Sequence, residues 1–150
     1  MTTIYVAGPV SGLNLLESKK HFERITDKIL DAFDPEEVTV LSPMSDGVPS
    51  GVIAQPAGYT QNVFTDRAIT ARCRAMVAKS SFVIADLSRA KSPSMGTACE
   101  MAWGYDDPSC MVLTIGRVAG GPMDHAFTNT FTDIFFDDIE GVIEFLLYNI

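Results

Sequence analysis

The feature that most constrains this chain is a set of short runs in which nearly every residue is apolar. Three of them, Thr3–Gly8, Ser81–Leu87 and Cys110–Ile115, have the sequences TIYVAG, SFVIADL and CMVLTI. A strand with one face in water alternates apolar and polar residues, whereas a strand covered on both faces is apolar along its length. The runs therefore predict central strands of a sheet that helices cover on both sides.

Segments with a helical pattern separate these strands. The apolar residues of the first one recur at spacings of three and four, at Phe22, Ile25, Ile29 and Phe33. This spacing predicts one face of a helix, and Asp34-Pro35 ends it. We expect further helices at about 65–79, 95–105 and 139–148, and further strands at Val38–Leu41 and within 133–138. The alternation predicts a single α/β domain over residues 1–150 with a parallel sheet, and 42–58 as a long irregular stretch.

The composition excludes several classes of protein. The net charge of −8 disfavours binding to nucleic acid, because that function needs clustered lysine and arginine. The cysteines, Cys73, Cys99 and Cys110, form no C-x-x-C pair, so we expect neither a metal site nor a disulfide. The start lacks the profile of a signal peptide, and no apolar run reaches the ~18 residues that span a membrane. We expect a cytoplasmic protein without a membrane partner.

Ligands of parallel sheets bind at the carboxyl ends of the strands. This rule selects the loops Gly8–Gly12, Asp86–Gly96 and Gly116–Asn129. The second loop leads into SPSMGTACEMAWGY, in which Glu100 is the one acidic residue. Thr97 and Glu100 match a capping box, which would give the glutamate a structural role. A solvent-facing glutamate is the other structural interpretation, and its small and apolar neighbours disfavour it.

Four segments resemble the nucleoside 2-deoxyribosyltransferase family, which includes the 2′-deoxynucleoside 5′-monophosphate N-hydrolases. They are IYVAGP, VIADL, SMGTACEMAWGY and the tail DIFFDDIEGVIEFL. The resemblance implies a flavodoxin-like three-layer sandwich with a five-stranded parallel sheet, no cofactor, and a homo-oligomer with shared active sites. It also implies that Glu100 attacks the anomeric carbon of a 2′-deoxynucleoside and carries the sugar, and that Tyr5 holds Glu100. We expect Glu100 in the first turn of its helix, where the dipole favours the ionised form, and Gly96 to let a sugar approach.

Ser94 stands where many of the transferases carry an aspartate that binds the sugar 5′-hydroxyl. A serine resembles the hydrolases, in which this residue contacts a 5′-phosphate, since a hydroxyl does not repel a phosphate. The loop containing Gly8, Pro9, Ser11 and Gly12 resembles their phosphate-binding glycine loop. The structural alternative for Ser94 is a helix cap.

The residue that protonates or orients the leaving base is less certain in this sequence. Relatives carry an aspartate about eight residues before the third strand, and Cys73 stands there. Asp66 is the nearest carboxylate upstream and our candidate. Asp86, at the end of the third strand, is another candidate for this role and a candidate for substrate binding, and a turn or cap residue is its structural alternative. In the third loop, His125 or Asn129 could project into the site of a neighbouring subunit.

The leading hypothesis is a deoxyribosyltransferase that acts on deoxynucleosides and free bases. An N-hydrolase of deoxynucleoside 5′-monophosphates is the first alternative. A nucleotide-binding protein without catalysis is the second, and Cys73 at the expected acid position favours it.

Overall fold

The computed structural model describes residues 1–10, 14–44, 54–55, 58–59, 66–116 and 119–150. A five-stranded parallel sheet forms its centre. Its strands lie in the order β2 (Val38–Leu41), β1 (Thr2–Ala7), β5 (Phe82–Asp86), β6 (Met111–Ile115) and β7 (Ile134–Phe136). Counted within the sheet this is the order 2-1-3-4-5, which confirms the predicted flavodoxin-like fold.

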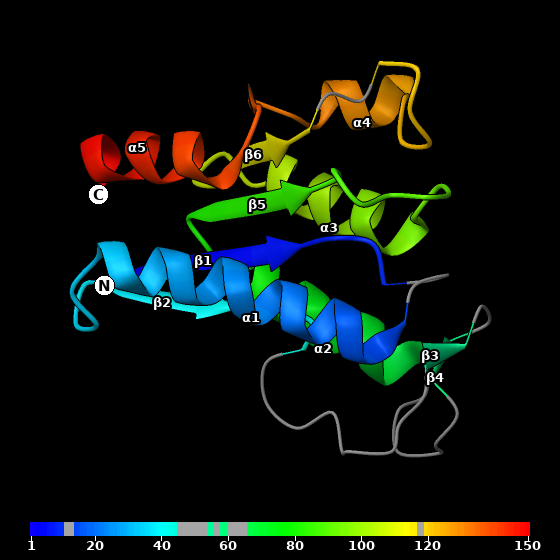
Figure 1. The fold of residues 1–150 in the computed structure, drawn as a ribbon, viewed down its shortest axis with the longest axis horizontal. Coiled ribbons are helices and arrows are strands. Elements are labelled where there is room, and N and C mark those ends of the chain that lie inside the picture. Colours follow the sequence, from blue (N-terminus) through cyan, green and yellow to red (C-terminus); the bar gives the residue numbers. More distant parts are fainter. Residues whose placement is uncertain (11–13, 45–53, 56–57, 60–65, 117–118) are drawn as a thin grey trace.

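Helices cover both faces of this sheet (Figure 1). They are α1 (Leu15–Ala32), α2 (Asp66–Val77), α3 (Met95–Tyr105), α4 (Ala126–Thr130) and α5 (Ile139–Asn149). Helices α1 and α5 pack on one face, and α2 and α3 pack on the other. In the described ranges, none of the helices combines the length and the apolar character that a membrane crossing requires.

Alternation along the strands divides the core into two clusters. In β1, Ile4 and Val6 face α1 and α5, whereas Tyr5 and Ala7 face α2 and α3. All four side chains are fully buried. The strands are therefore apolar along their length because both faces of the sheet are buried, as the sequence predicted.

Two elements differ from the sequence-based expectation. Within the stretch 42–58 that we predicted as irregular, Ala54–Gln55 (β3) pairs antiparallel with β4 (Gly58–Tyr59), so that prediction is wrong at these residues. Helix α4 was not predicted at all. It is too short to show a helical period in the sequence, and it begins where the side chain of His125 accepts a hydrogen bond from the Phe127 amide.

Candidate active site

Glu100 is buried in the second turn of α3. The helix begins at Met95 after Ser94, its N-cap, so Glu100 is its sixth residue and only 6% of it is exposed. The predicted capping box is wrong, because Thr97 is the third helical residue and not the cap. The expected position in the first turn is also wrong, and the dipole consequently favours the ionised form less than we expected. Glu100 is therefore neither part of a capping box nor a solvent-facing glutamate, and neither role explains why a carboxylate is buried here.

Tyr5 of β1 holds this carboxylate. Its hydroxyl donates a 2.6 Å hydrogen bond to Oε1 of Glu100, which lies 95 positions later in the sequence. The Tyr5 side chain is fully buried. Burial, reinforced by the charge of Glu100, raises the pKa of Tyr5 far above its ordinary value. The phenol therefore stays protonated and remains a donor.

Cys73 of α2 completes a buried cluster with Tyr5 and Glu100. Burial, followed by the charge of Glu100, raises the pKa of the Cys73 thiol to about 11. It is therefore protonated at neutral pH. The sequence count placed Cys73 where relatives carry an aspartate, and the structure puts this residue against Glu100.

Burial dominates the electrostatics of Glu100. It raises the pKa of this carboxyl to about 7, while the hydrogen bonds from Tyr5 and Cys73 lower it. Among the described residues, no lysine, arginine or histidine forms an ion pair with Glu100. A buried carboxylate without a cation costs stability, and such groups concentrate at functional sites. Near neutral pH the site holds Glu100 in a mixture of its ionised and protonated forms.

Asp66, the predicted acid, lies elsewhere on α2. It is the first residue of the helix and is exposed, and it lines a surface depression with Arg67 and Arg74. Seven residues separate it from Cys73, which corresponds to about 10 Å along the helix axis. The structure brings Cys73, and not Asp66, to Glu100.

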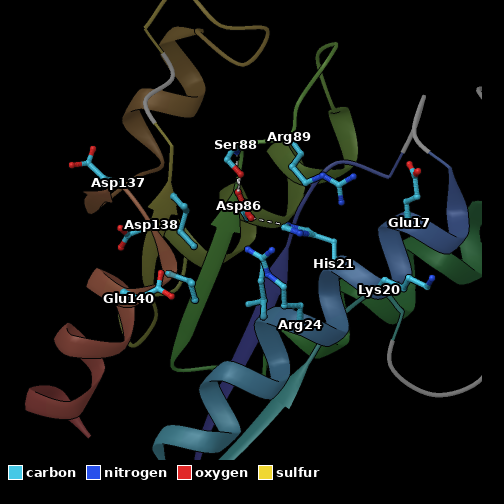
Figure 2. Close-up of a pocket in the computed structure, with 13 residues that line it drawn as sticks. Glu17, Lys20, His21, Arg24, Asp86, Ser88, Arg89, Asp137, Asp138 and Glu140 are labelled. Atoms are coloured by element: carbon cyan, nitrogen blue, oxygen red, sulfur yellow. Dashed lines mark hydrogen bonds and ion pairs between the residues drawn. The ribbon is translucent and has the colours of Figure 1, made fainter.

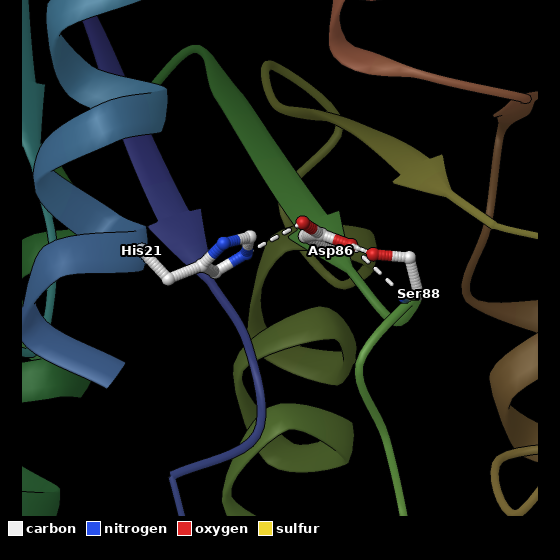
Figure 3. Close-up of polar contacts among 3 residues, drawn as sticks. All are labelled: His21, Asp86 and Ser88. Atoms are coloured by element: carbon white, nitrogen blue, oxygen red, sulfur yellow. Dashed lines mark hydrogen bonds and ion pairs between the residues drawn. The ribbon is translucent and has the colours of Figure 1, made fainter. Parts of the chain in front are cut away.

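Asp86 belongs to a different cluster, on the α1/α5 side of the sheet (Figure 2). One of its oxygens lies 2.7 Å from Nε2 of His21, and the other accepts hydrogen bonds from the Ser88 hydroxyl and amide (Figure 3). Although burial works to raise it, the bonds from His21 and Ser88 hold the pKa of Asp86 below its ordinary value. Because Val83 and Ala85 face α3, their neighbour Asp86 points away from Glu100.

The loop residues predicted to bind substrate have mixed surroundings. Gly8 is buried just after β1, and a Cβ there would lie 3.3 Å from the carbonyl oxygen of Asp86, so a larger residue would make a tight contact with the end of β5. Pro9 is also buried, whereas Ser11 and Gly12 lie outside the described residues. Gly96 is exposed, and a Cβ there would meet nothing within 4 Å.

Ser94 is the N-cap of α3, which is the structural role that the sequence analysis gave as an alternative to phosphate binding. Its hydroxyl lies 2.9 Å from that of Thr97 and accepts from the Thr97 amide at 3.4 Å, and its own amide contacts Met123. It lines a second cavity of about 510 Å³ between α3 and α4, together with His125 and Phe127. Ser94 is buried and its hydroxyl contacts Thr97, so a contact between Ser94 and a phosphate is a proposal only.

His125 and Asn129 are both exposed, and His125 lines the cavity between α3 and α4. His125 caps α4 and packs on the ring of Phe127, with ring centroids 5.3 Å apart. The Asn129 amide donates to Asp124 over 3.4 Å. Phe127 is 64% exposed and Met95 is 76% exposed, so apolar surface lies beside His125 in this cavity.

Sequence reasoning missed His21 and Ser88. Asp86, an acidic end to an apolar strand, was the available signal for this cluster, but nothing in the pattern of α1 marks His21. In the part of the chain that the structure describes, no three His, Cys, Asp or Glu side chains gather as a metal ion requires.

Comparison with known proteins gives similarity in structure alone. No family model matches the sequence, and no curated protein matches it significantly. One similar structure is a 2-desoxiribosyltransferase from Leishmania mexicana, with a TM-score of 0.58 and 19% identity, covering 99% of this chain and 98% of that chain. Another is DNA processing protein A from Helicobacter pylori, described by its single-stranded DNA binding mode, with a TM-score of 0.61, 11% identity, and coverage of 99% and 81%. This chain therefore shares its α/β fold with both proteins.

Proposed function

We propose that the protein cleaves the N-glycosidic bond of 2′-deoxynucleosides and transfers the sugar to another nucleobase, with Glu100 as the nucleophile. The observation that carries the proposal is the buried Glu100 carboxylate, held by the Tyr5 hydroxyl at 2.6 Å and lacking a cationic partner among the described residues. The similar fold of the Leishmania mexicana enzyme supports it.

The chemistry would proceed in two displacements at one carbon. An ionised Oε of Glu100 forms a bond to the anomeric carbon while the bond to the base nitrogen breaks, and the base leaves with that electron pair and then takes up a proton. A ring nitrogen of the acceptor base then attacks the anomeric carbon from the opposite side, the bond to the Glu100 oxygen breaks and restores the carboxylate, and the acceptor nitrogen gives up its proton to solvent. Two inversions retain the configuration, as in retaining glycosidases.

The surroundings of Glu100 suit a nucleophile that must be charged and yet reactive. Tyr5 and Cys73 donate hydrogen bonds that favour the ionised form, and burial opposes them. Neutral hydrogen-bond donors stabilise a carboxylate less than a salt bridge does. The oxygen of Glu100 therefore remains available as a nucleophile. The pKa of about 7 keeps a large ionised fraction at neutral pH.

We further propose that the protein works as a homo-oligomer. Exposed Met95 and Phe127 line the cavity between α3 and α4 together with His125. Large exposed apolar side chains that adjoin a cavity are typical of protein–protein contact sites. Sedimentation velocity measures the assembly, and a monomer at micromolar concentration would contradict this part of the proposal.

An N-hydrolase acting on deoxynucleoside 5′-monophosphates is the second candidate, and Ser94 favours it. A hydroxyl in place of a carboxylate at the start of α3 places no negative charge against a phosphate. Single-stranded DNA binding, by analogy with the Helicobacter pylori protein, receives less support, because the net charge of −8 opposes contact with a polyanion.

The test is incubation of the protein with deoxyinosine and adenine, followed by chromatography of the products. Deoxyadenosine is the expected product, and Glu100→Gln should lower its rate of formation by ~10³-fold or more. Glu144→Gln, at an exposed position on α5, is the matched control and should retain full activity. Base release from monophosphates without transfer would instead identify the hydrolase. Ligand binding without release of base would leave the non-catalytic alternative.

A further inference from the structure

The α1/α5 side of the sheet contains a cavity of about 510 Å³ at the carboxyl ends of β5 and β6. Its apolar floor consists of Ile25, Ile115 and Ile139, and its polar groups come from α1, from the loop after β5 and from the start of α5 (Figure 2). A cavity of this size with an apolar floor and a few convergent polar groups is typical of a small-molecule site. Because Asp86 points toward α1 whereas Glu100 belongs to α3 on the opposite face of the sheet, this cavity is separate from the proposed catalytic site.

Two arginines lie on one wall of this cavity. Arg24 comes from α1 and Arg89 from the loop after β5, and Figure 2 shows both guanidinium groups on the side of the Asp86–His21 pair. Within the described ranges, neither guanidinium has a carboxylate within 4 Å. Arg24 lies near enough to Glu140 for its charge to contribute to lowering the pKa of that carboxyl, but it forms no salt bridge with it. Two arginines on one wall that are not held in salt bridges can offer their donors to a phosphate.

The Asp86–His21 pair gives this wall a fixed structure. Asp86 is only 5% exposed, and Ser88 and His21 bind its two oxygens. The negative charge of Asp86 is therefore already matched by donors that point at it. His21, which the buried Asp86 carboxylate holds, lines the cavity on the same side as the two arginines (Figure 2).

The opposite wall is acidic, but two of its carboxylates have partners. Glu140 forms an ion pair with Lys28, and Asp138 caps α5 by accepting from the Gly141 amide. Asp137 is exposed on the same wall. Glu17 and Lys20 of α1 also line the cavity and contribute one charge of each sign. The arginines can therefore accept one anionic group, whereas the carboxylates around them disfavour a polyanion.

We propose that this cavity binds a phosphate monoester of a small organic molecule, with the phosphate between Arg24 and Arg89 and the organic part on the isoleucine floor. Each arginine donates two parallel hydrogen bonds to phosphate oxygens, which is the geometry that guanidinium groups favour. The assignment does not depend on the reaction at Glu100.

The two histidines of the sequence, His21 and His125, provide the measurement. Imidazole resonances of the untagged protein are followed by NMR during titration with inorganic phosphate and, separately, with phenyl phosphate. We expect the His21 resonances to move and those of His125, in the cavity between α3 and α4, to stay. We also expect phenyl phosphate to bind more tightly than inorganic phosphate, because only the ester reaches the apolar floor. Equal affinities would overturn the assignment to a monoester.

Variants test which residues bind the phosphate. Arg24→Gln and Arg89→Gln should each weaken phenyl phosphate binding about tenfold or more. Arg74→Gln, an equal loss of charge on exposed α2, should leave it unchanged. Glu100→Gln should also leave it unchanged, which separates this site from the catalytic proposal. An immobile His21 resonance, or full affinity in both cavity variants, would overturn the proposal.

Discussion

Replacing Glu100 with glutamine should make the folded protein more stable relative to the wild type as the pH rises from 4.5 to 8. The folded state releases the proton of Glu100 near pH 7, because burial raises its pKa to about 7, whereas the reference value is 4.5. Between these two pH values the folded state binds more protons than the unfolded state. The free energy of unfolding of the wild type therefore falls as the pH rises through this range.

The magnitude follows from the same two pKa values. Below pH 4.5 Glu100 is neutral in both states and imposes no penalty, and above pH 7 it is ionised in both and imposes the full one. The gap between the two pKa values corresponds to about 3 kcal/mol. Glutamine has nearly the same shape, can still accept from Tyr5, and does not titrate. Since a domain of this size has a stability of roughly 5–15 kcal/mol, the effect is large enough to measure.

Urea unfolding at pH 4.5, 6, 7 and 8 measures this effect. The quantity of interest is the difference in free energy of unfolding between Glu100→Gln and the wild type, in which the titration of all other carboxylates cancels. Glu144→Gln, at an exposed position, should show a constant difference over the same range. If the difference for Glu100→Gln is also constant, Glu100 ionises like a surface carboxylate, and the argument that burial controls its charge is refuted.

Two further predictions concern the packing and the charge of the same region. Tyr5→Phe removes the hydrogen bond to Oε1 and should raise the pKa of Glu100 by about one to two units. The pH–rate profile of the proposed reaction should then move to higher pH, because the nucleophile must be ionised. An unchanged profile would contradict this role of Tyr5. Gly104→Ala places a Cβ 2.9 Å from Cγ2 of Val83 and should cost roughly 1–3 kcal/mol in urea unfolding, whereas Gly96→Ala, whose Cβ meets nothing within 4 Å, should cost nothing.

The fold followed from the sequence because the sheet is buried on both faces. Runs such as SFVIADL have no polar alternation, and this pattern fits few structures other than a covered parallel sheet. The short elements did not follow. Helix α4 has five residues, and the strands β3 and β4 have two each, so none is long enough to show a period. Their formation depends on local caps and pairing that composition does not reveal.

The environment of Glu100 was predicted from the wrong local motif. Thr97 and Glu100 have the spacing of a capping box, but Ser94 is an equally good cap three residues earlier and begins the helix there. Two competing caps cannot be ranked from sequence, since the choice depends on how the helix packs. The earlier start moves Glu100 into the second turn, where Tyr5 and Cys73 reach it. Burial and hydrogen bonds, more than the helix dipole, therefore control its charge.

Strand alternation explains why candidates that share a sheet edge do not share a site. Asp86 ends β5 at the carboxyl edge, where the rule for parallel sheets places ligands, and this made it a candidate beside Glu100. The rule selects an edge, but an edge has two faces. Ala85, Asp86's neighbour, packs with Tyr5 under α3, so Asp86 must point toward α1, where it meets His21. Once each candidate is assigned a face, the residues separate into the buried cluster of Tyr5, Cys73 and Glu100, proposed to act on a sugar, and an arginine-lined cavity, proposed to bind a phosphate.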